Sequence, residues 1–174
     1  MRPLEKLLRL DARYSLSARI PDDKPFLKTA AAFFAHSGDS WFWGAGLTLV
    51  WFIGPRAWRS QIGLLFLGIV ITALTVLSLK FLIKRPRPEG EWGRVYRSSD
   101  PHSFPSGHAA RAAMLTVITL LSGLWWMGLI LAVWTILVDL SRVGLGVHYF
   151  SDILVGTLIG VIMGALAFGI YSLI

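Results

Sequence analysis

Four long stretches without a charged residue constrain the fold of this chain more than any other feature of its sequence. They run over residues 41–55, 61–79, 112–138 and 153–174. A helix that crosses the hydrocarbon core of a bilayer needs roughly 20 apolar residues, and the second and fourth stretches reach that length. The chain has 174 residues, of which 55% are hydrophobic and 16% are charged. This composition excludes a disordered chain and argues against a water-soluble domain.

The third stretch, taken with its flanks, is too long for one crossing. A single helix over 106–141 would be about 50 Å long, and it would put His108 and His148 on opposite membrane faces. A break at Ser122-Gly123 gives a hairpin that puts both histidines on one face. We therefore predict an all-α, polytopic membrane helical bundle with about five transmembrane helices, over 40–58, 61–83, 106–122, 125–142 and 150–173.

Residues 1–39 differ in kind from the rest of the chain. Apolar side chains share one helical face, basic side chains lie mostly off it, and Asp11 interrupts the apolar face. The apolar members are Leu4, Leu7, Leu8, Ala12 and Tyr14, and the basic members are Arg2, Lys6, Arg9 and Arg13. We predict an N-terminal amphipathic interfacial helix in an arm over 1–39, lying on anionic headgroups, and a membrane-embedded domain over 40–174. Asp39 or Ser40 is expected to cap the first span, and no signal peptide is expected.

The remaining composition narrows the kinds of site and partner. The chain has no cysteine, which excludes a disulfide-stapled domain and a zinc-finger site. Its net charge is +7, and most of its Lys and Arg residues lie on the arm and on the polar segment 84–104. Basic residues beside membrane spans fit anionic lipids, and we expect membrane lipids as partners, no nucleic acid and no obligate protein partner.

Residues suited to binding a phosphate gather at three places on one predicted membrane side. Lys80 and Arg87 flank the end of the second span, and Arg142 ends the fourth span. Arginines fork onto phosphate oxygens, and a lysine adds a compact charge. Ser106 and Gly107 begin the third span, where free backbone N–H groups and the positive end of the helix dipole attract an anion.

Two histidines on that side can divide the cleavage of a phosphate ester. One attacks phosphorus, while the other protonates the departing oxygen and then activates water. His148 and Asp152 are one helical turn apart, so the carboxylate can accept a hydrogen bond from the imidazole and leave its other nitrogen free. With three cations on the phosphate, the chemistry needs no metal ion. Each residue alone is more often structural, as with lysines that snorkel at helix ends; it is the conjunction that indicates a phosphate site.

Three segments carry a family resemblance: Lys80-x6-Arg87-Pro88, Pro105-Ser106-Gly107-His108 and Ser141-Arg142-x5-His148-x3-Asp152. Together they resemble the complete three-part signature of the type-2 phosphatidic acid phosphatase superfamily of membrane lipid phosphatases. The resemblance implies that His148 is the nucleophile and forms a phosphohistidine, that Asp152 orients it, and that His108 is the general acid and then the base. It implies that the phosphate is held by Lys80, Arg87, Ser106, Gly107 and Arg142, and that the reaction uses no metal and no cofactor.

The expected function is therefore hydrolysis of the phosphomonoester or diphosphate of a lipid. Phosphatidylglycerophosphate, phosphatidate and polyprenyl phosphate or diphosphate remain alternatives as substrate, and so short a chain leaves little room for a specificity domain, which favours promiscuity. A non-catalytic anionic-lipid binder or flippase of the same fold is the alternative function. Soluble vanadium haloperoxidases share the signature, but the uncharged spans argue against one.

The expected location is a prokaryotic cell membrane, with the site on the side that carries the arm. Seven Lys and Arg residues lie in the arm, and the positive-inside rule places them in the cytoplasm. Bacterial lipid phosphatases of the resembled family commonly face outward, so the opposite orientation stays open. We expect Asp139 to pair with Arg142 and His36 to be exposed. Arg111 has two open roles, a headgroup contact and a structural pairing, and no role is assigned to Asp100 or His102.

Overall fold

The computed structural model describes residues 3–90, 92 and 100–173 of the chain. Within these residues the regular secondary structure is helical, which confirms the predicted all-α class; the β pairing described there is an isolated bridge between Pro86 and His102. The helices are α1 (Pro3–Ser17), α2 (Pro25–Ser37), α3 (Ser40–Ile53), the 3-10 helix η1 (Arg56–Trp58), α4 (Arg59–Ile83), α6 (Gly107–Leu121), α7 (Trp125–Gly144) and α8 (Phe150–Tyr171).

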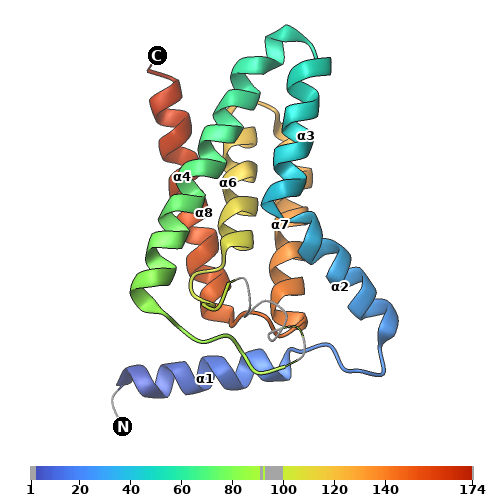
Figure 1. Cartoon of the computed structure of the whole chain (residues 1–174), viewed down its shortest axis with the longest axis vertical. Coiled ribbons are helices and arrows are strands. Elements are labelled where there is room, and N and C mark those ends of the chain that lie inside the picture. Colours follow the sequence, from blue (N-terminus) through green and yellow to red (C-terminus); the bar gives the residue numbers. More distant parts are fainter. Residues whose placement is uncertain (1–2, 91, 93–99, 174) are drawn as a thin grey trace.

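Five helices, α3, α4, α6, α7 and α8, run along the long axis of the molecule, and α1 lies across one end of them (Figure 1). α6 ends at Leu121 and α7 begins at Trp125, so the chain turns back at the predicted break. A residue with positive φ, Gly123, lies in this turn. Residues 84–90, which follow α4, the start of α6 and the turn between α7 and α8 all lie at the end where α1 lies (Figure 1). This arrangement gathers the polar segments of the chain at one end.

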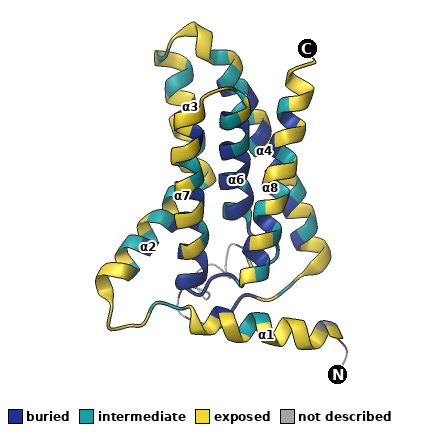
Figure 2. Ribbon diagram, turned by 180° about the vertical axis from the view of Figure 1, so that it is seen from behind, coloured by how far each residue is buried: buried dark blue, intermediate teal, exposed yellow. Residues whose placement is uncertain are grey.

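α6 forms the centre of the bundle, and its residues are the most deeply buried ones (Figure 2). α8 packs directly against it, because α8 carries glycines at the positions that face α6. A Cβ atom at Gly156 would lie 2.5 Å from the Ser106 carbonyl oxygen, and one at Gly160 would collide with the Ala110 carbonyl. Small residues spaced four apart let membrane helices approach this closely. The contact brings the first turn of α8 beside the first turn of α6.

Three helical segments are long and apolar enough to cross a membrane: Arg56–Ile83, Trp125–Gly144 and Phe150–Tyr171. α3 and α6 are apolar but have only 14 and 15 residues, about 21 to 23 Å at 1.5 Å per residue. The first span predicted over 40–58 is therefore too long as a single helix. It stops at Ile53 because Gly54 adopts an extended conformation and Pro55, which follows, has no N–H to continue the helix.

The N-terminal residues form two helices that contact the bundle at different places. α1 caps the start of α8: the Ser15 hydroxyl accepts from the Phe150 N–H at 3.0 Å, and Asp11 accepts from the Ser151 N–H at 3.1 Å. Asp11, the residue that interrupts the apolar face, is thus one that binds the bundle. α2 packs beside α7, where its buried alanines, Ala31 and Ala35, cluster with Leu145 and Val147.

Candidate active site

Both predicted catalytic histidines line one cavity of about 310 Å³ at the end of the bundle where α1 lies. His108 belongs to the first turn of α6, and His148 belongs to the turn between α7 and α8. Lys80, from the last turn of α4, and Gly107 also line this cavity. Residues separated by up to 68 positions in the chain therefore share one space. The close α6–α8 packing described above is what brings the two histidines within reach of one ligand.

The hydrogen bonds of His148 define which of its ring nitrogens can react. Nη1 of Arg87 donates to Nε2 of His148 at 3.3 Å. Because a guanidinium can only donate, Nε2 is the acceptor and the proton of the neutral ring sits on Nδ1. Nδ1 lies 3.4 Å from Oδ2 of Asp152, at the long end of the hydrogen-bond range. The lone pair on Nε2 is therefore the nucleophilic position of this ring.

Burial and positive charge keep His148 neutral. Its side chain is almost fully buried, with 1% of its surface exposed. Burial, followed by the charges of Arg142, Arg87 and Lys80, holds the pKa of His148 well below its usual value of 6.5. A neutral imidazole at neutral pH is the form that can attack phosphorus.

Asp152 is held at both of its carboxylate oxygens, so it has little freedom to turn away from His148. It accepts from the Tyr149 N–H at 2.9 Å, which closes a capping box at the start of α8. Its other oxygen accepts from Arg85 at 2.7 Å. Arg85 in turn donates to Asp11 of α1 at 2.8 Å and stacks 3.9 Å over the Tyr149 ring. Sequence reasoning missed Arg85, which holds the Asp152 carboxylate, and Asp11, which holds Arg85.

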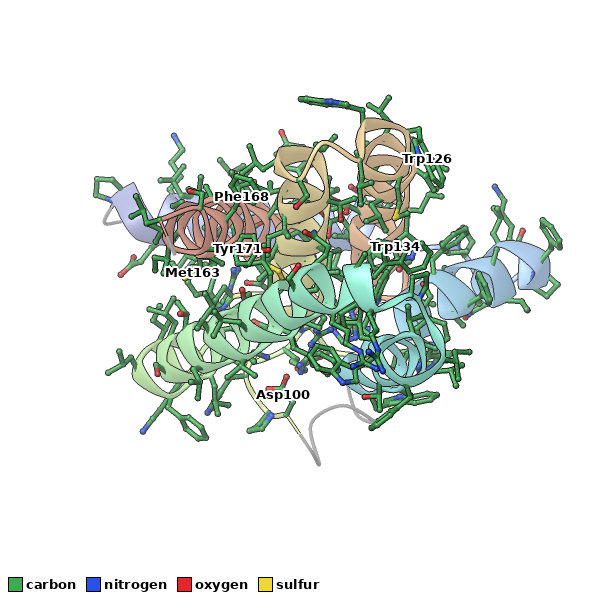
Figure 3. All side chains as sticks on the ribbon, turned by 90° about the horizontal axis from the view of Figure 1, so that it is seen from above. Asp100, Trp126, Trp134, Met163, Phe168 and Tyr171 are labelled. Atoms are coloured by element: carbon green, nitrogen blue, oxygen red, sulfur yellow. The ribbon has the colours of Figure 1, made fainter. Side chains whose placement is uncertain are left out.

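Lys80 and Arg87 share a carboxylate that was given no role from the sequence. Oδ2 of Asp100 accepts from Nζ of Lys80 at 2.5 Å and from Nη2 of Arg87 at 2.8 Å. Both cations are buried, while the Asp100 side chain is 41% exposed. Viewed along the bundle, Asp100 lies at its outer side, below the ribbons of α3 and α4 in the picture (Figure 3). An anionic oxygen already bridges the two side chains predicted to bind phosphate.

His108 is also held by a carboxylate. This partner comes from the corner between α2 and α3, which is formed by residues 37–39. Oδ1 of Asp39 lies 2.7 Å from Nε2 of His108, and its Oδ2 lies 3.2 Å from Nδ1 of His36. Burial opposes ionisation of Asp39, but the hydrogen bonds and charges of His108 and His36 lower its pKa to about 2. Asp39 stands at the N-cap position of α3, as expected, but its side chain makes no capping hydrogen bond.

The other predicted phosphate-binding residues lie at the same end of the bundle. Ser106 is the N-cap of α6, and its buried hydroxyl accepts from the Ala109 N–H at 3.4 Å. Gly107 lines the cavity opposite Val76, whose Cγ1 would lie 3.6 Å from a Cβ at that position. Arg142 lies in the last turn of α7 and is fully buried. The positive charge of Arg142 helps to lower the pKa of His148.

The structure also describes the surroundings of Arg111, Asp139 and His36, which were discussed from the sequence. Arg111 donates to the carbonyl oxygen of Gly38 and also lines the cavity. Asp139 accepts from the Thr157 hydroxyl at 2.9 Å, and its pairing with Arg142 stays a prediction. His36 is about half exposed.

The wall of the cavity away from the charged groups is apolar and comes from α4. It is formed by Ile69, Ala73, Val76, Leu77 and Phe81, together with Thr72. α4 also presents apolar side chains to the outside of the bundle, among them Leu74 and Leu82. A ligand with a phosphate at one end and a hydrocarbon at the other matches this division. Across residues 3–90, 92 and 100–173, no group of three or more His, Asp or Glu side chains is placed to hold a metal ion; metal independence stays a prediction.

Comparison with known proteins gives the same family as the signature. Residues 61–173 match the PAP2 superfamily. The chain is 27% identical to a solved structure described as the first transmembrane PAP2 type phosphatidylglycerolphosphate phosphatase from Bacillus subtilis, with a TM-score of 0.73 over 97% of this chain and 88% of that one. It is 30% identical to Aquifex aeolicus LpxE, with a TM-score of 0.68 over 93% of this chain and 94% of that one.

A curated relative shares a shorter region. An undecaprenyl-diphosphatase from Sulfolobus acidocaldarius is 39% identical over 59 residues, which is 34% of this chain and 29% of the relative. The family match, by contrast, includes most of the membrane helices and all three signature segments. The chain therefore belongs to the PAP2 superfamily.

Proposed function

We propose that this protein is a membrane lipid phosphatase that works through a phosphohistidine on His148 and without a metal ion. The observation that carries the proposal is that His108, His148 and Lys80 line one cavity that also has a largely apolar wall from α4. A lipid phosphate offers the matching combination of a charged end and a hydrocarbon chain. Membership of the PAP2 superfamily supports the same reaction class.

The reaction divides into two displacements at phosphorus. In the first, Nε2 of His148 bonds to phosphorus, the bond from phosphorus to the ester oxygen breaks, and His108 gives a proton to that oxygen. In the second, His108 takes a proton from water as the water oxygen bonds to phosphorus, and the bond from phosphorus to His148 breaks. Inorganic phosphate and the dephosphorylated lipid are the products. Lys80, Arg87 and Arg142 neutralise the phosphoryl oxygens, which is the task that a metal ion performs elsewhere.

Binding of the phosphate requires it to replace Asp100 as the partner of Lys80 and Arg87. Nη1 of Arg87, which donates to Nε2 of His148 at 3.3 Å, then donates to a phosphate oxygen, and the Nε2 lone pair becomes available to phosphorus. The backbone N–H groups at the start of α6 add donors toward the same anion.

Candidate substrates are phosphatidylglycerophosphate, phosphatidate and polyprenyl phosphate or diphosphate. The relatives named above act on two of these kinds of lipid by their descriptions. We propose that the protein accepts more than one of them, because the apolar wall from α4 offers few polar groups that could distinguish one lipid tail from another.

In the membrane, we propose five crossings, with the shorter helices α3 and α6 completed by their flanking residues. Most of α6, from Ala109 to Thr119, is enclosed by its neighbours, so most of its length meets protein rather than lipid. We further propose that 1–39 forms the interfacial arm and 40–174 the embedded domain, in a prokaryotic cell membrane with the site on the cytoplasmic side. Rapid labelling of a single cysteine at position 89 by an impermeant reagent in intact cells would contradict that orientation.

The decisive experiment measures release of inorganic phosphate from the candidate lipids, side by side, in proteoliposomes containing EDTA. We expect release from more than one lipid, and its loss in His148→Ala. Labelled phosphate from the lipid should also be trapped on the wild-type protein in an alkali-stable, acid-labile form, and not on the variant. Absence of release by the wild type from every lipid and under every detergent condition would favour the anionic-lipid binder or flippase. Acceptance of one lipid alone would refute promiscuity.

A further inference from the structure

The corner between α2 and α3 is held firmly against the site, although it lies far from the three signature segments in the sequence. The Ser37 hydroxyl accepts from the indole N–H of Trp134 at 2.9 Å, and the Ser37 carbonyl accepts from the indole N–H of Trp43 at 3.1 Å. The two indole rings pack with centroids 5.2 Å apart. Ser37 is thus tied to both α3 and α7.

The next residue brings the corner into contact with His108. A Cβ at Gly38 would lie 3.1 Å from Cδ2 of His108 and 3.3 Å from Cγ1 of Val138, so a larger residue would push the corner outward. Arg111, one turn after His108 on α6, donates to the Gly38 carbonyl. The backbone leading into Asp39 is therefore fixed relative to the imidazole.

Resting on the proposed phosphatase function, we propose that Asp39 is a positioning residue that holds His108 for proton transfer. Its carboxylate accepts the Nε2–H of His108 at 2.7 Å, which leaves Nδ1 as the nitrogen that exchanges a proton with the substrate. Asp39 does not itself touch the reacting atoms.

The charge of Asp39 suits the half-reaction in which His108 must carry a proton. Arg111 on α6 and Arg142 on α7 act on His108 as positive charges, and Lys80 and His148 lie across the shared cavity. Burial of the ring and the charges of Arg142 and Arg111 oppose a positive imidazolium at His108, whereas the Asp39 carboxylate stabilises it. The pKa of Asp39 near 2 means that this negative charge is present throughout the neutral range.

The proton steps follow from this arrangement. As the bond between phosphorus and the ester oxygen breaks, the proton on Nδ1 of the imidazolium passes to that oxygen, and the lipid leaves as an alcohol. His108 is then neutral, with its Nε2–H still bound to Asp39. When water attacks the phosphohistidine, Nδ1 takes the proton from water and the imidazolium is restored.

Two substrates whose leaving groups differ in basicity can distinguish a role of Asp39 in proton transfer from a merely structural role. Only the more basic leaving group needs a proton from His108. An alkoxide leaving from a short-chain lipid phosphate needs a proton, whereas p-nitrophenolate leaves without one. We expect Asp39→Asn to lower kcat/KM, which reports the steps through departure of the leaving group, about 10- to 100-fold for the lipid phosphate and to change it less than about threefold for p-nitrophenyl phosphate. The alkaline limb of the pH profile for the lipid phosphate should move to lower pH, because the imidazolium has lost its anionic partner. Asp39→Glu should recover part of the activity.

His108→Ala sets the reference, since it should show the same dependence on the leaving group with a larger loss. Asp22→Asn is the matched control: this carboxylate lies in the connection between α1 and α2, is almost fully exposed and pairs with Lys28. We expect it to leave both activities unchanged. Equal losses on both substrates in Asp39→Asn, with an unmoved pH profile, or no loss at all, would overturn the proposal.

A second measurement does not depend on catalysis. In the wild type with 15N-labelled histidine, the His108 ring should show a hydrogen-bonded Nε2–H, and Asp39→Asn should shift or abolish that signal. A wild type that releases no phosphate refutes the proposed function, whereas a neutral His108 with its proton on Nδ1 refutes the Asp39 proposal by itself.

Discussion

The two histidines of the site are both held by a carboxylate, but the two pairs are built in different ways. His148 and Asp152 are four residues apart in one short piece of chain, and both are almost fully buried. His108 and Asp39 are 69 residues apart and meet between two packed segments, with both side chains partly exposed. The first pair lies within one short piece of chain at the start of α8, and the second depends on how the α2–α3 corner docks on the bundle.

The difference suits the two predicted roles. A nucleophile must present one nitrogen in one orientation, and the buried carboxylate together with the capping of α8 restricts it to that orientation. A general acid and base must gain and lose a proton while ligands come and go, which favours a position at the wall of the cavity. In the predicted mechanism, the same pairing of an imidazole with a carboxylate therefore serves a rigid function and an exchanging one.

Substitution of the buried carboxylate is expected to have the largest effect. In Asp152→Asn the amide can donate to Nδ1 of His148, which moves the ring proton to Nε2 and removes the nucleophilic lone pair. We expect kcat to fall about a thousandfold on lipid phosphates and on p-nitrophenyl phosphate alike. Equal losses on both substrates would set this pair apart from His108–Asp39, whereas a loss confined to the lipid phosphate would contradict the assigned roles.

Substitution of Asp100 tests whether Lys80 and Arg87 bind the phosphate. Asp100→Asn removes the anion that bridges Lys80 and Arg87, so inorganic phosphate and vanadate no longer have to displace a charge. We expect their inhibition constants to fall about fivefold, since a partly exposed ion pair contributes up to about 1 kcal/mol. Asp22→Asn again serves as the control. Unchanged or weaker inhibition would show that Asp100 does not compete with phosphate.

The smallest expected effect is on the acid limb of the pH profile of kcat/KM, which should depend on protonation of His148. The lowered pKa of His148 means that the free enzyme keeps a neutral nucleophile below pH 6.5, the usual histidine value. Because the unfolded chain takes up this proton first, His148 also makes the folded state less stable as the pH falls below 6.5. We expect kcat/KM, after correction for the separately measured ionisation of the substrate, to fall only below pH 6.5. A midpoint at or above that value would contradict the neutral His148.

Much of the fold was predictable because it depends on local composition. Uncharged stretches, a glycine at a turn and a proline after a span are properties of short segments, and they gave the helices from 59 to 171 to within two residues at nearly every end. The first span was predicted too long because Gly54 and Pro55 lie inside an uncharged stretch and end α3 there. A hydropathy pattern does not detect a helix break within an uncharged stretch. Pro55 itself indicated the break, because proline has no backbone N–H to continue the helix.

Part of the site was likewise predictable from local sequence, and part of it was not. His148 and Asp152 could be paired from their spacing, since four residues make one helical turn. Asp11 carried a weak signal, an acidic residue within an apolar face, but nothing in the sequence indicated that it caps α8 or holds Arg85. Asp39 was predicted only as a helix cap, because that is what an acidic residue before a helix usually does.

The sequence by itself determined the helical membrane class and the hairpin that places both histidines at one end, and it predicted which residues hold a phosphate. The tertiary structure alone decided which carboxylate meets His108 and that Asp100 bridges the phosphate-binding cations. The reason is physical: helix periodicity and hydropathy act over a few residues, whereas contacts between distant segments depend on how closely the helices pack. Here that packing is set by the glycines of α8 against the backbone of α6.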